Sequence, residues 1–595
     1  MNERPTRLFD LPAFQLERFP QEDMLCIKEN GAWRRHATGE VCEMINSLTT
    51  GLLRLGISCG DGSVAGSDKI AILAYNRPEW IIADQACQQL GAVVVPIYPT
   101  VNAQELGFIL KEASVKVVFA GDAALLALAK SAREDPENDP EIFTFEEVPG
   151  ARYWKSLCLA PTAGEQADID RIKASITPEH IATIIFTSGT TGIPKGVMLS
   201  HSNIMSNVIA CFPYLPVTSK SRALSFLPLN HVYERMIDYL YIYAGVSIYY
   251  AESMETIAEN LREIKPHIFT TVPRLLEKVY ERITEKGLAL SGIKKRMFDW
   301  SITLGLRYEI NKQMGGWYRL QLWLARRLVF KKWRDALGGN VEAIVTGSAA
   351  CQVRLLKLFT AAGVDILEGY GLTETSPVIS VNRMEVSDRM FGTVGPAIQD
   401  VTIQIAADGE ILCKGPNVMA GYYKRPDLTE AAITNGWFHT GDIGELVGGR
   451  FLKITDRKKE LFKTSGGKYV APQPIENKMK ESPYIAEIMV VGADRKFPSA
   501  LIVPDFRHLK TWCGAHALPV MDDRGSLLSR PEVMALFKEE VEKYNESFNH
   551  VEQIKKFVLL RQEWTIETGE LSQALKLKRK EILKKYGDAI EGMYR

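Results

Sequence analysis

The chain has 595 residues, of which 46% are hydrophobic and 24% charged, a composition typical of folded enzymes and unlike that of disordered or fibrous proteins. Lys and Arg together number 72, and so do Asp and Glu, so no net positive charge favours binding to nucleic acid. The 9 cysteines are scattered and form no C-x-x-C pair, which argues against a disulfide framework or a zinc site.

The N-terminal residues contain no apolar core of a secretory signal, and we expect a cytoplasmic protein in a reducing compartment. The longest strongly apolar stretch, residues 239–251, is too short to span a bilayer. The sequence therefore indicates a soluble protein or one that rests on the cytoplasmic face of a membrane.

Residues 68–101 read as an apolar run, a segment of helical period and a second apolar run, which is a βαβ pattern. Further apolar runs follow at 115–121, 180–187, 223–229, 267–273 and 341–347. Because helical stretches separate these runs, the chain before about residue 380 is predicted to be α/β with mainly parallel sheets.

Beyond about residue 380, short alternating runs broken by Gly and Asp predict a β-rich subdomain. From residue 456 the chain shows a hairpin candidate at 462–472, then strands, helices and a basic helix-prone tail. We predict a large domain over 1–455 and a small α+β domain over 456–595.

The string TSGTTGIPKG at 187–196 directly follows the apolar strand 181–186. Its glycines allow close approach of backbone to phosphate oxygens, its hydroxyls can donate hydrogen bonds, and its lysine adds positive charge. The spacing is not that of a Walker A loop. The alternative, a polar surface turn, accounts poorly for such a density of hydroxyls and glycines after a buried strand.

This string resembles the phosphate loop of the adenylate-forming superfamily, which includes acyl-CoA synthetases, luciferases and peptide-synthetase adenylation domains. The resemblance continues in order through LPLNHVYER (227–235), TGSAA (346–350), EGYGLTET (368–375), HTGDIGEL (439–446), residues 456–476 and LKLKRK (575–580). It implies two half-reactions: a carboxylate attacks the α-phosphorus of ATP to give an acyl-adenylate and pyrophosphate, and the thiol of coenzyme A then displaces AMP.

The resemblance also implies a role for each matching residue in binding ATP. The residues expected to bind the phosphates are Thr187, Ser188, Gly189, Thr190, Thr191, Gly192 and Lys195. Those expected to form the base pocket are Gly347, Ser348, Ala349, Glu368, Gly369, Tyr370, Gly371, Leu372 and Thr373. Tyr370 is expected to stack on adenine. Asp442 is expected to accept hydrogen bonds from the ribose hydroxyls, with Arg457 beside it. Glu374 and the hydroxyl of Thr187 are expected to ligate Mg²⁺, a hard cation that prefers oxygen.

For catalysis, the resemblance assigns Lys576 and His231 to the acyl carboxylate and the α-phosphate. For Lys576 the alternatives are a solvated basic helix, or Lys578 or Lys580 as the reactive lysine, because the lead-in at 572–574 departs from the family pattern. For His231 the alternative is a structural histidine.

The family rotates its small domain between the two half-reactions, and Asp456 occupies the hinge position. The same resemblance places the hairpin residues Lys463, Ser465, Gly466 and Gly467 along the channel for coenzyme A, where glycine leaves room for the narrow thiol arm. The alternative is an ordinary glycine hairpin.

Segments 328–339 and 456–476 look most like the long-chain fatty-acyl-CoA synthetase branch, so the substrates implied are a fatty acid, ATP and coenzyme A, in a monomer or homodimer. Residues 315–339 are basic and amphipathic, which suits peripheral membrane contact, although a helix packed on its own domain is the favoured alternative. Other functions left open are activation of another acid, transfer to a carrier protein, and a catalytically silent nucleotide-binding protein. No G-x-S-x-G or H-E-x-x-H motif points to a hydrolase.

Overall fold

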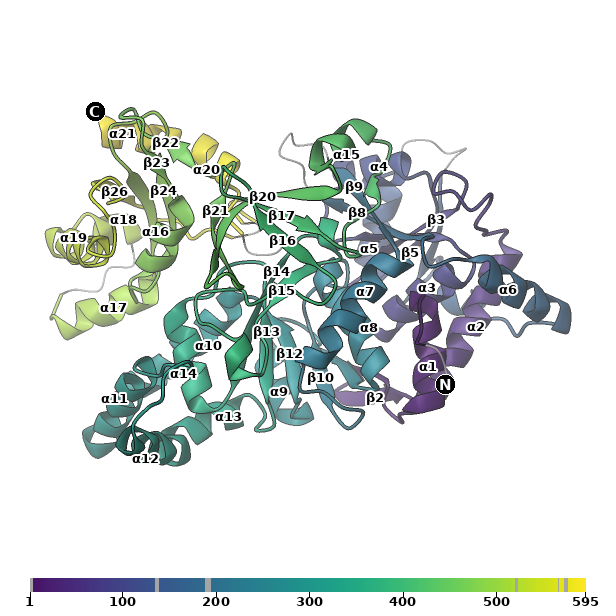
Figure 1. The fold of residues 1–595 in the computed structure, drawn as a ribbon, viewed down its shortest axis with the longest axis horizontal. Coiled ribbons are helices and arrows are strands. Elements are labelled where there is room, and N and C mark those ends of the chain that lie inside the picture. Colours follow the sequence, from purple (N-terminus) through teal and green to yellow (C-terminus); the bar gives the residue numbers. More distant parts are fainter. Residues whose placement is uncertain (1–3, 134–138, 188–193, 519–522, 566, 572–575) are drawn as a thin grey trace.

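The computed structural model describes residues 4–133, 139–187, 194–518, 523–565, 567–571 and 576–595. Figure 1 shows a large body and a smaller one, which carries the C-terminus and is attached at one end of the large body. The prediction of a large α/β domain with a β-rich subdomain and a small α+β domain is confirmed.

The first large sheet contains the predicted βαβ unit. β3 and β4 pair in parallel, with Lys69 opposite Val93, and α3 connects them. The neighbouring strands from β7 to β8 pair in parallel, and at the other edge β9 pairs antiparallel with both β8 and β18. The order is β7 (Arg152–Tyr153), β6 (Glu141–Thr144), β5 (Val115–Ala120), β3 (Lys69–Leu73), β4 (Val93–Ile97), β8 (Ile181–Thr187), β9 (Lys195–Ser200) and β18 (Gly421–Tyr422).

The second large sheet has antiparallel strands only at its two edges. Its order is β15 (Val378–Val381), β14 (Asp365–Gly371), β13 (Ala343–Thr346), β12 (Ile268–Thr271), β10 (Arg222–Ser225), β11 (Ser247–Tyr250), β1 (Leu25–Glu29) and β2 (Ala32–His36). The predicted run 223–229 is a strand only as far as Ser225. The prediction was too long, because Pro228 lacks the N–H that a central strand must donate.

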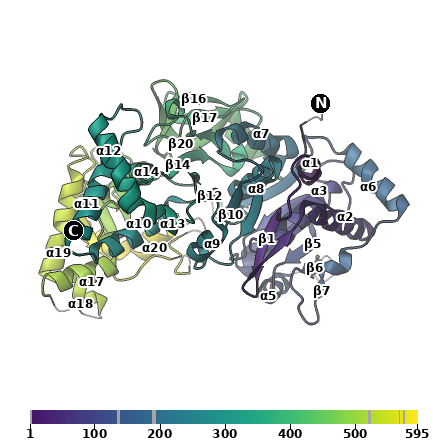
Figure 2. The ribbon, with the colours of Figure 1, turned by 90° about the horizontal axis from the view of Figure 1, so that it is seen from below.

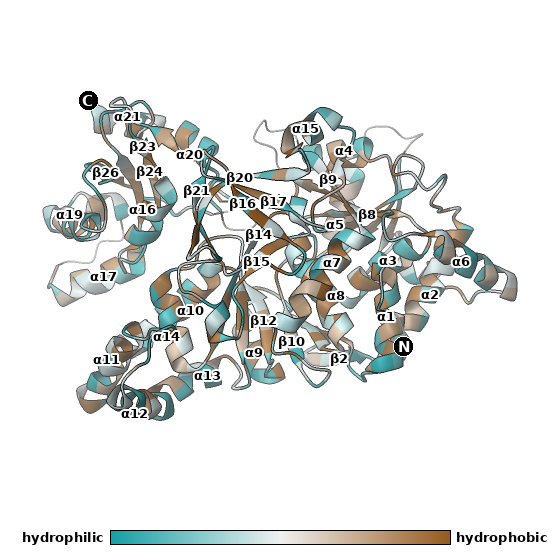
Figure 3. Cartoon of the chain, viewed as in Figure 1, coloured by the Kyte–Doolittle hydropathy of each residue, from teal (hydrophilic) through white to brown (hydrophobic). Residues whose placement is uncertain are grey.

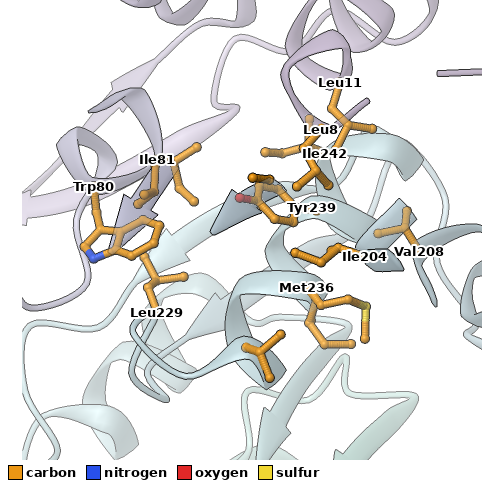
Figure 4. Close-up of a cluster of buried hydrophobic side chains, with 14 of the residues drawn as sticks. Leu8, Leu11, Trp80, Ile81, Ile204, Val208, Leu229, Met236, Tyr239 and Ile242 are labelled. Carbon is orange, nitrogen blue, oxygen red and sulfur yellow. The ribbon is translucent and has the colours of Figure 1, made fainter. Parts of the chain in front are cut away.

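One helical layer lies between the two large sheets. A single cluster of buried apolar side chains joins both sheets to α1 (Leu11–Arg18), α2 (Thr38–Arg54), α3 (Pro78–Gln89), α7 (His201–Cys211) and α8 (Val232–Ala244). Figure 4 shows part of this core, where Leu8, Tyr239 and Ile242 lie close together and Trp80 lies beside Ile81 and Leu229. The apolar stretch 239–251 therefore divides into the end of α8 and β11, and Gly245, with φ of 76°, makes the turn between them.

A buried ion pair anchors α8 to α3. Arg235 pairs with Asp84 and donates to Tyr239 over 2.9 Å, and the Tyr239 hydroxyl also contacts Asp84. Arg235 further donates to Thr183 on β8 over 2.9 Å. Removing one partner of such a pair leaves an uncompensated buried charge, so the network holds α8 in one position relative to the first sheet.

The remaining helices cover the outer faces and the periphery. The first sheet carries α4 (Ala103–Glu112) and α5 (Ala123–Ser131), and α6 (Ala163–Ser175) packs on α2. The second sheet carries α9 (Ile257–Ile264), α10 (Pro273–Leu288), α11 (Gly292–Leu306), α12 (Gly316–Ala325), α13 (Lys331–Ala336) and α14 (Val353–Ala362). Figure 3 shows mixed hydropathy on α11, α12 and α13.

The β-rich subdomain is a five-stranded sheet of β16 (Thr402–Ile405), β17 (Glu410–Lys414), β19 (Ile433–Thr434), β20 (Trp437–Val447) and β21 (Phe451–Arg457), with α15 (Pro426–Ala432) beside it. The small domain begins with the predicted hairpin, β22 (Phe462–Lys463) and β23 (Tyr469–Val470). It continues with α16 (Pro472–Met479), β24 (Ile485–Val491), β25 (Ser499–Pro504), α17 (Phe506–Ala515), α18 (Arg524–Leu528), α19 (Pro531–Asn545), β26 (Lys556–Leu559), α20 (Arg579–Lys585) and α21 (Gly587–Tyr594).

Across the parts of the chain that the structure describes, no helix combines the length and the apolar character needed to cross a bilayer.

Candidate active site between the two domains

The two ends of the predicted phosphate loop face each other at the edge of the first sheet. Thr187 ends β8, Lys195 begins β9, and the two residues are paired across the antiparallel ladder. The Thr187 hydroxyl donates to the Lys195 carbonyl over 3.5 Å. The predicted phosphate residues Ser188, Gly189, Thr190, Thr191 and Gly192 lie outside the described residues.

Lys195 reaches from this loop to the acidic residue of the EGYGLTET motif. Its Nζ lies 2.9 Å from Glu374 Oε1 and 2.5 Å from the hydroxyl of Tyr422, which itself donates to Glu374 over 2.8 Å. Glu374 is 8% exposed and lies in a short 3₁₀ turn, Thr373–Thr375, after β14. Tyr422 was not predicted from the sequence, because its strand has only two residues and is too short to show the alternating pattern of a β-strand.

The donors around Glu374 fit a hard cation that arrives with a nucleotide. Glu374 and Thr187 offer a carboxylate and a hydroxyl, whereas Mg²⁺ needs six oxygen ligands and usually takes most of them from water and substrate phosphates. Among the described residues, no three His, Cys, Asp or Glu side chains gather as a dedicated metal site. Glu374 and Thr187 could supply two of the six oxygen ligands, and a cation here would need the others from water or from a bound ligand.

Asp442 lies where the five-stranded sheet meets β14. It receives a 2.7 Å hydrogen bond from the hydroxyl of Tyr370, and Arg457, its cross-strand partner on β21, places Nε 3.4 Å from its second oxygen. Burial raises the pKa of Asp442, and the charge of Arg457 opposes that rise. The arrangement brings together the predicted ribose and base residues, although stacking of Tyr370 on adenine stays a prediction.

The turn regions of the predicted base pocket lie side by side. Gly347 and Ser348 follow β13, and Gly369, Tyr370 and Gly371 end β14, its neighbour in the sheet. A Cβ on Gly371 would lie 1.7 Å from the carbonyl oxygen of Pro377, so only glycine fits there. Ala349, Leu372 and Thr373 continue the same two segments.

Glu368 precedes this pocket on β14. Its Oε1 accepts a 3.1 Å hydrogen bond from the backbone of Cys351, and burial raises its pKa to about 8. Sequence reasoning used only the backbone of Glu368, whereas the structure shows a buried carboxyl group at that position.

Lys576 comes from the small domain into the same region. Burial and the charge of Arg457 lower its pKa to about 8, and Asp442 and Glu460 act in the opposite direction. The alternative of a solvated basic helix is wrong for Lys576, since α20 begins only at Arg579. Lys578 and Lys580, the other candidates, are exposed.

His231 precedes α8 and caps its first turn. Its Nδ1 accepts a 3.1 Å hydrogen bond from the backbone N–H of Tyr233, and burial together with the charge of Lys576 lowers its pKa to about 4. A neutral imidazole that accepts at Nδ1 carries its proton on Nε2. His231 can therefore donate one hydrogen bond to an anionic oxygen.

A narrow apolar cavity of about 60 Å³ begins at His231 and the glycine turns and continues between α8 and the second sheet. Its walls include Met236 and Ile237 from α8, Val345 from β13, and Val378 and Val381 from β15. Tyr214 and Leu215, which follow α7, also line it. Sequence reasoning could not distinguish these residues from ordinary core, because both are apolar.

The predicted hinge adjoins this site, since Asp456 lies opposite Ile443 on the neighbouring strand, whereas the predicted hairpin contacts residues 494 and 495 within the small domain. Asp456 is buried in β21, its carboxylate accepts from the backbone of Arg457 (2.6 Å) and Gln473 (3.3 Å), and burial raises its pKa to about 6. Lys463 belongs to β22, and Ser465, Gly466 and Gly467 form the hairpin turn. None of these hairpin residues is among those that line the cavity in this orientation of the domains.

Comparison with known proteins gives a consistent result. A family model described as AMP-binding enzyme matches residues 13–423, and one described as AMP-binding enzyme C-terminal domain matches residues 460–595. The long-chain-fatty-acid–CoA ligase FadD15 of Mycobacterium bovis is 33% identical over 95% of this chain and 93% of its own length. The peroxisomal long chain acyl-CoA synthetase 6 of Arabidopsis thaliana is 31% identical over 95% and 82%.

A solved structure of similar fold is the adenylation domain of a carboxylate reductase from Mycobacterium chelonae. It is 21% identical, covers 100% of this chain and 92% of its own, and superposes with a TM-score of 0.73.

Proposed function

This chain belongs to the AMP-binding enzyme family, and from that membership we propose that it is an AMP-forming ligase that joins a long-chain fatty acid to coenzyme A at the expense of ATP. The observation that carries the proposal is the position of Lys576. A lysine from the small domain interacts electrostatically with Asp442 and with His231, at the mouth of an apolar cavity.

In the first half-reaction, the carboxylate of the fatty acid lies beside His231 and its first carbons enter the apolar cavity, which at about 60 Å³ must widen to take the rest of a long chain. Lys576 attracts both the carboxylate and the α-phosphate, and its charge offsets the negative charge that accumulates as the oxygen–phosphorus bond forms. Nε2 of His231 donates to one of the same oxygens. Tyr370, Asp442 and Arg457 hold the nucleoside, so that pyrophosphate leaves in line with the attack.

Lys195 and the loop at 187–192 bind the β- and γ-phosphates. Glu374 and Thr187 would hold Mg²⁺, which would supply positive charge to offset the charge of the phosphates. Tyr422 keeps Glu374 oriented through its hydrogen bond. Before nucleotide binds, the ion pair between Lys195 and Glu374 holds these two side chains in place at the site.

In the second half-reaction, the small domain turns about Asp456 and withdraws Lys576. The hairpin with Lys463, Ser465, Gly466 and Gly467 takes its place and admits the thiol of coenzyme A to the acyl-adenylate. AMP then leaves. The domain division at residue 456 and the monomeric or homodimeric state are part of this proposal.

Release of pyrophosphate tests the proposal directly. With ATP and Mg²⁺, turnover should rise from acetate to oleate and should require coenzyme A. Pyrophosphate release that does not depend on coenzyme A would favour transfer of the acyl group to a carrier protein. A preference for short or aromatic acids would mean that the substrate is not a long-chain fatty acid. No pyrophosphate release with any acid would favour a nucleotide-binding protein without catalysis.

We also propose that α12 rests on the cytoplasmic face of a membrane, from which an insoluble acid can be drawn. Tyr318, Leu322 and Ala325 bury its inner face, as the packed-helix alternative requires. The outer face, however, is not merely basic: it exposes Trp317 (72%) and Trp323 (54%), among other large apolar side chains. On α12 these are Leu320 and Leu324, beside exposed Arg319. The π-helical turn Arg326–Phe330 that continues the helix adds exposed Leu328 and Arg327, and α13 adds Lys331. Aromatic, apolar and basic groups on one helix suit an anionic bilayer.

Arg326 does not belong to this surface. Its guanidinium donates to the carbonyls of Ala361 (2.8 Å) and Thr360 (3.2 Å) at the end of α14, so its role is structural.

Replacing Trp317 and Trp323 with alanine is expected to weaken binding to anionic vesicles roughly tenfold or more, since each large apolar side chain contributes about 1.5–3 kcal/mol when buried. Co-sedimentation with phosphatidylglycerol vesicles measures the loss. Turnover on detergent-solubilised fatty acid should stay unchanged. Met254→Ala, which removes a 50% exposed apolar side chain elsewhere, is the matched control. Unchanged sedimentation of the double variant would return α12 to a purely structural role.

A further inference from the structure

The two domains meet at a second contact, away from the cavity lining. α10 and the start of α14, both in the large domain, face the end of α16 and the start of β24 in the small domain. Figures 1 and 2 both show α10 next to the small domain.

Four charged side chains cross this contact in alternating order. Lys480 Nζ lies 3.1 Å from Glu487 and 3.8 Å from Glu277, and Arg274 lies 3.0 Å from Glu277 and 3.6 Å from Glu487. Each domain contributes one cation and one carboxylate: Arg274 and Glu277 come from α10, Lys480 and Glu487 from the small domain. We call these four residues the charge cluster.

The charge cluster is mostly shielded from solvent. Glu277 and Glu487 are each 8% exposed. Burial acts to raise the pKa of Glu277, yet Lys480 and Arg274 hold that pKa below its ordinary value. The glutamate is therefore ionised in this orientation, and its charge is compensated from both domains at once.

Arg354 and Gln352, at the start of α14, add hydrogen bonds to the small-domain backbone. Arg354 donates to the carbonyl of Glu481 over 2.7 Å and to that of Lys480 over 3.4 Å. Gln352 donates to the Lys480 carbonyl over 3.5 Å and, within the large domain, to Glu277 over 2.9 Å. The carbonyls at the end of a helix have no partner within the helix, so a cation from the other domain is a favourable cap.

We propose that the charge cluster and Arg354 form a latch that holds the small domain in the orientation carrying Lys576 to the nucleotide, and that the latch must open before coenzyme A reacts. This inference rests on the proposed function, because it assumes two orientations. Arg274, Glu277, Arg354, Lys480 and Glu487 are positioning residues on this view. Rotation of the small domain separates the partners, and the free energy of that separation sets the relative populations of the two domain orientations.

Arg354→Ala tests the latch, because it removes two interdomain hydrogen bonds without touching the cavity. Formation of acyl-adenylate in a single turnover should slow about tenfold, the loss typical of hydrogen bonds that involve a charged group. Thioester formation from supplied acyl-AMP and coenzyme A should stay unchanged or accelerate. Glu277→Gln should shift the two half-reactions in the same directions.

The matched control is Arg507→Ala. Arg507 also crosses between the domains, 2.8 Å from Glu285, but its side chain is 74% exposed. Exposed pairs contribute little, so both half-reactions should stay within about twofold. Equal loss of both half-reactions in Arg354→Ala, together with a lower melting temperature, would reduce the contact to a structural one, and no change in either would overturn the latch.

A readout without substrate separates failure of the latch from failure of the proposed function. Thiol-reactive fluorophores attached to Lys130→Cys in α5 and Lys538→Cys in α19, both exposed positions, report the orientation of the domains by energy transfer after Cys42, Cys59 and Cys158 are replaced by serine. Arg354→Ala should change the transfer efficiency of the resting protein, and Arg507→Ala should not. An unchanged efficiency in Arg354→Ala contradicts the latch whatever the reaction catalysed.

Discussion

Replacing Lys576 with alanine is expected to slow acyl-adenylate formation by about 10²–10³-fold, the loss typical of removing a preorganised group that stabilises charge in a transition state. Thioester formation from supplied acyl-AMP should be nearly normal, because the small domain has by then withdrawn Lys576. Pyrophosphate release and thioester formation, measured separately, check the two halves.

Lys578→Ala and Lys580→Ala are the controls, since both side chains are exposed and lie within four residues of Lys576. Each should leave adenylation within about twofold. A large loss in either would transfer the catalytic role to that lysine, and equal loss of both half-reactions in Lys576→Ala would remove the support for two orientations.

The pH dependence of adenylation follows from the same lysine. Burial and Arg457 lower the pKa of Lys576 to about 8, so its protonated fraction falls as pH rises through that value. kcat/KM for the acid reports the free enzyme and should decline above about pH 8, whereas the thioester half-reaction should not. Lys576→Arg should abolish the decline up to about pH 10, since guanidinium stays charged there.

Glu374→Gln is expected to lower adenylation by about 10²-fold or more and to raise the Mg²⁺ concentration that gives half-maximal rate. The substitution keeps the size of the side chain but removes the charge that faces Lys195 and, in the proposal, the cation. Pyrophosphate release titrated with Mg²⁺ measures both effects.

Tyr422→Phe provides the comparison, because it removes one neutral hydroxyl, which donates to Glu374 and accepts from Lys195, and should cost about tenfold or less. If Glu374→Gln instead stays within a few fold of the parent, with an unchanged Mg²⁺ requirement, Glu374 would serve only to position Lys195.

The sequence predicted those parts of the site that consist of short, uninterrupted motifs. Lys195, Glu374 and Asp442 lie in strings whose spacing is set by a single turn, and the structure brings Lys195 together with Glu374 and Asp442 together with Tyr370. The βαβ unit at β3, α3 and β4 was predictable for the same reason, since its periodicity lies within one local segment.

Features that depend on distant partners were not predictable from the sequence. Tyr422 acts on Glu374, 48 residues away, from a strand of two residues, and Arg326 finds its acceptors 34 and 35 residues further along the chain. Arg326 therefore looked like one more cation of a basic helix. The charge cluster likewise joins residues of two domains whose pairing no local pattern encodes.

The ion pair beneath α8 has a consequence for how enzymes of this shape can change their substrate. Because the ion pair between Asp84 and Arg235 fixes α8, the cavity wall that carries Met236 and Ile237 keeps one position whichever acid is bound. Tyr214 and Leu215, which line the cavity after α7, are only half-buried, and Tyr214 is held by the Arg383 guanidinium 4.0 Å from its ring centre and not by a buried ion pair. Substitutions that adapt such an enzyme to shorter or bulkier acids should therefore occur mainly in the segment after α7, whereas the sequence of α8 should change little.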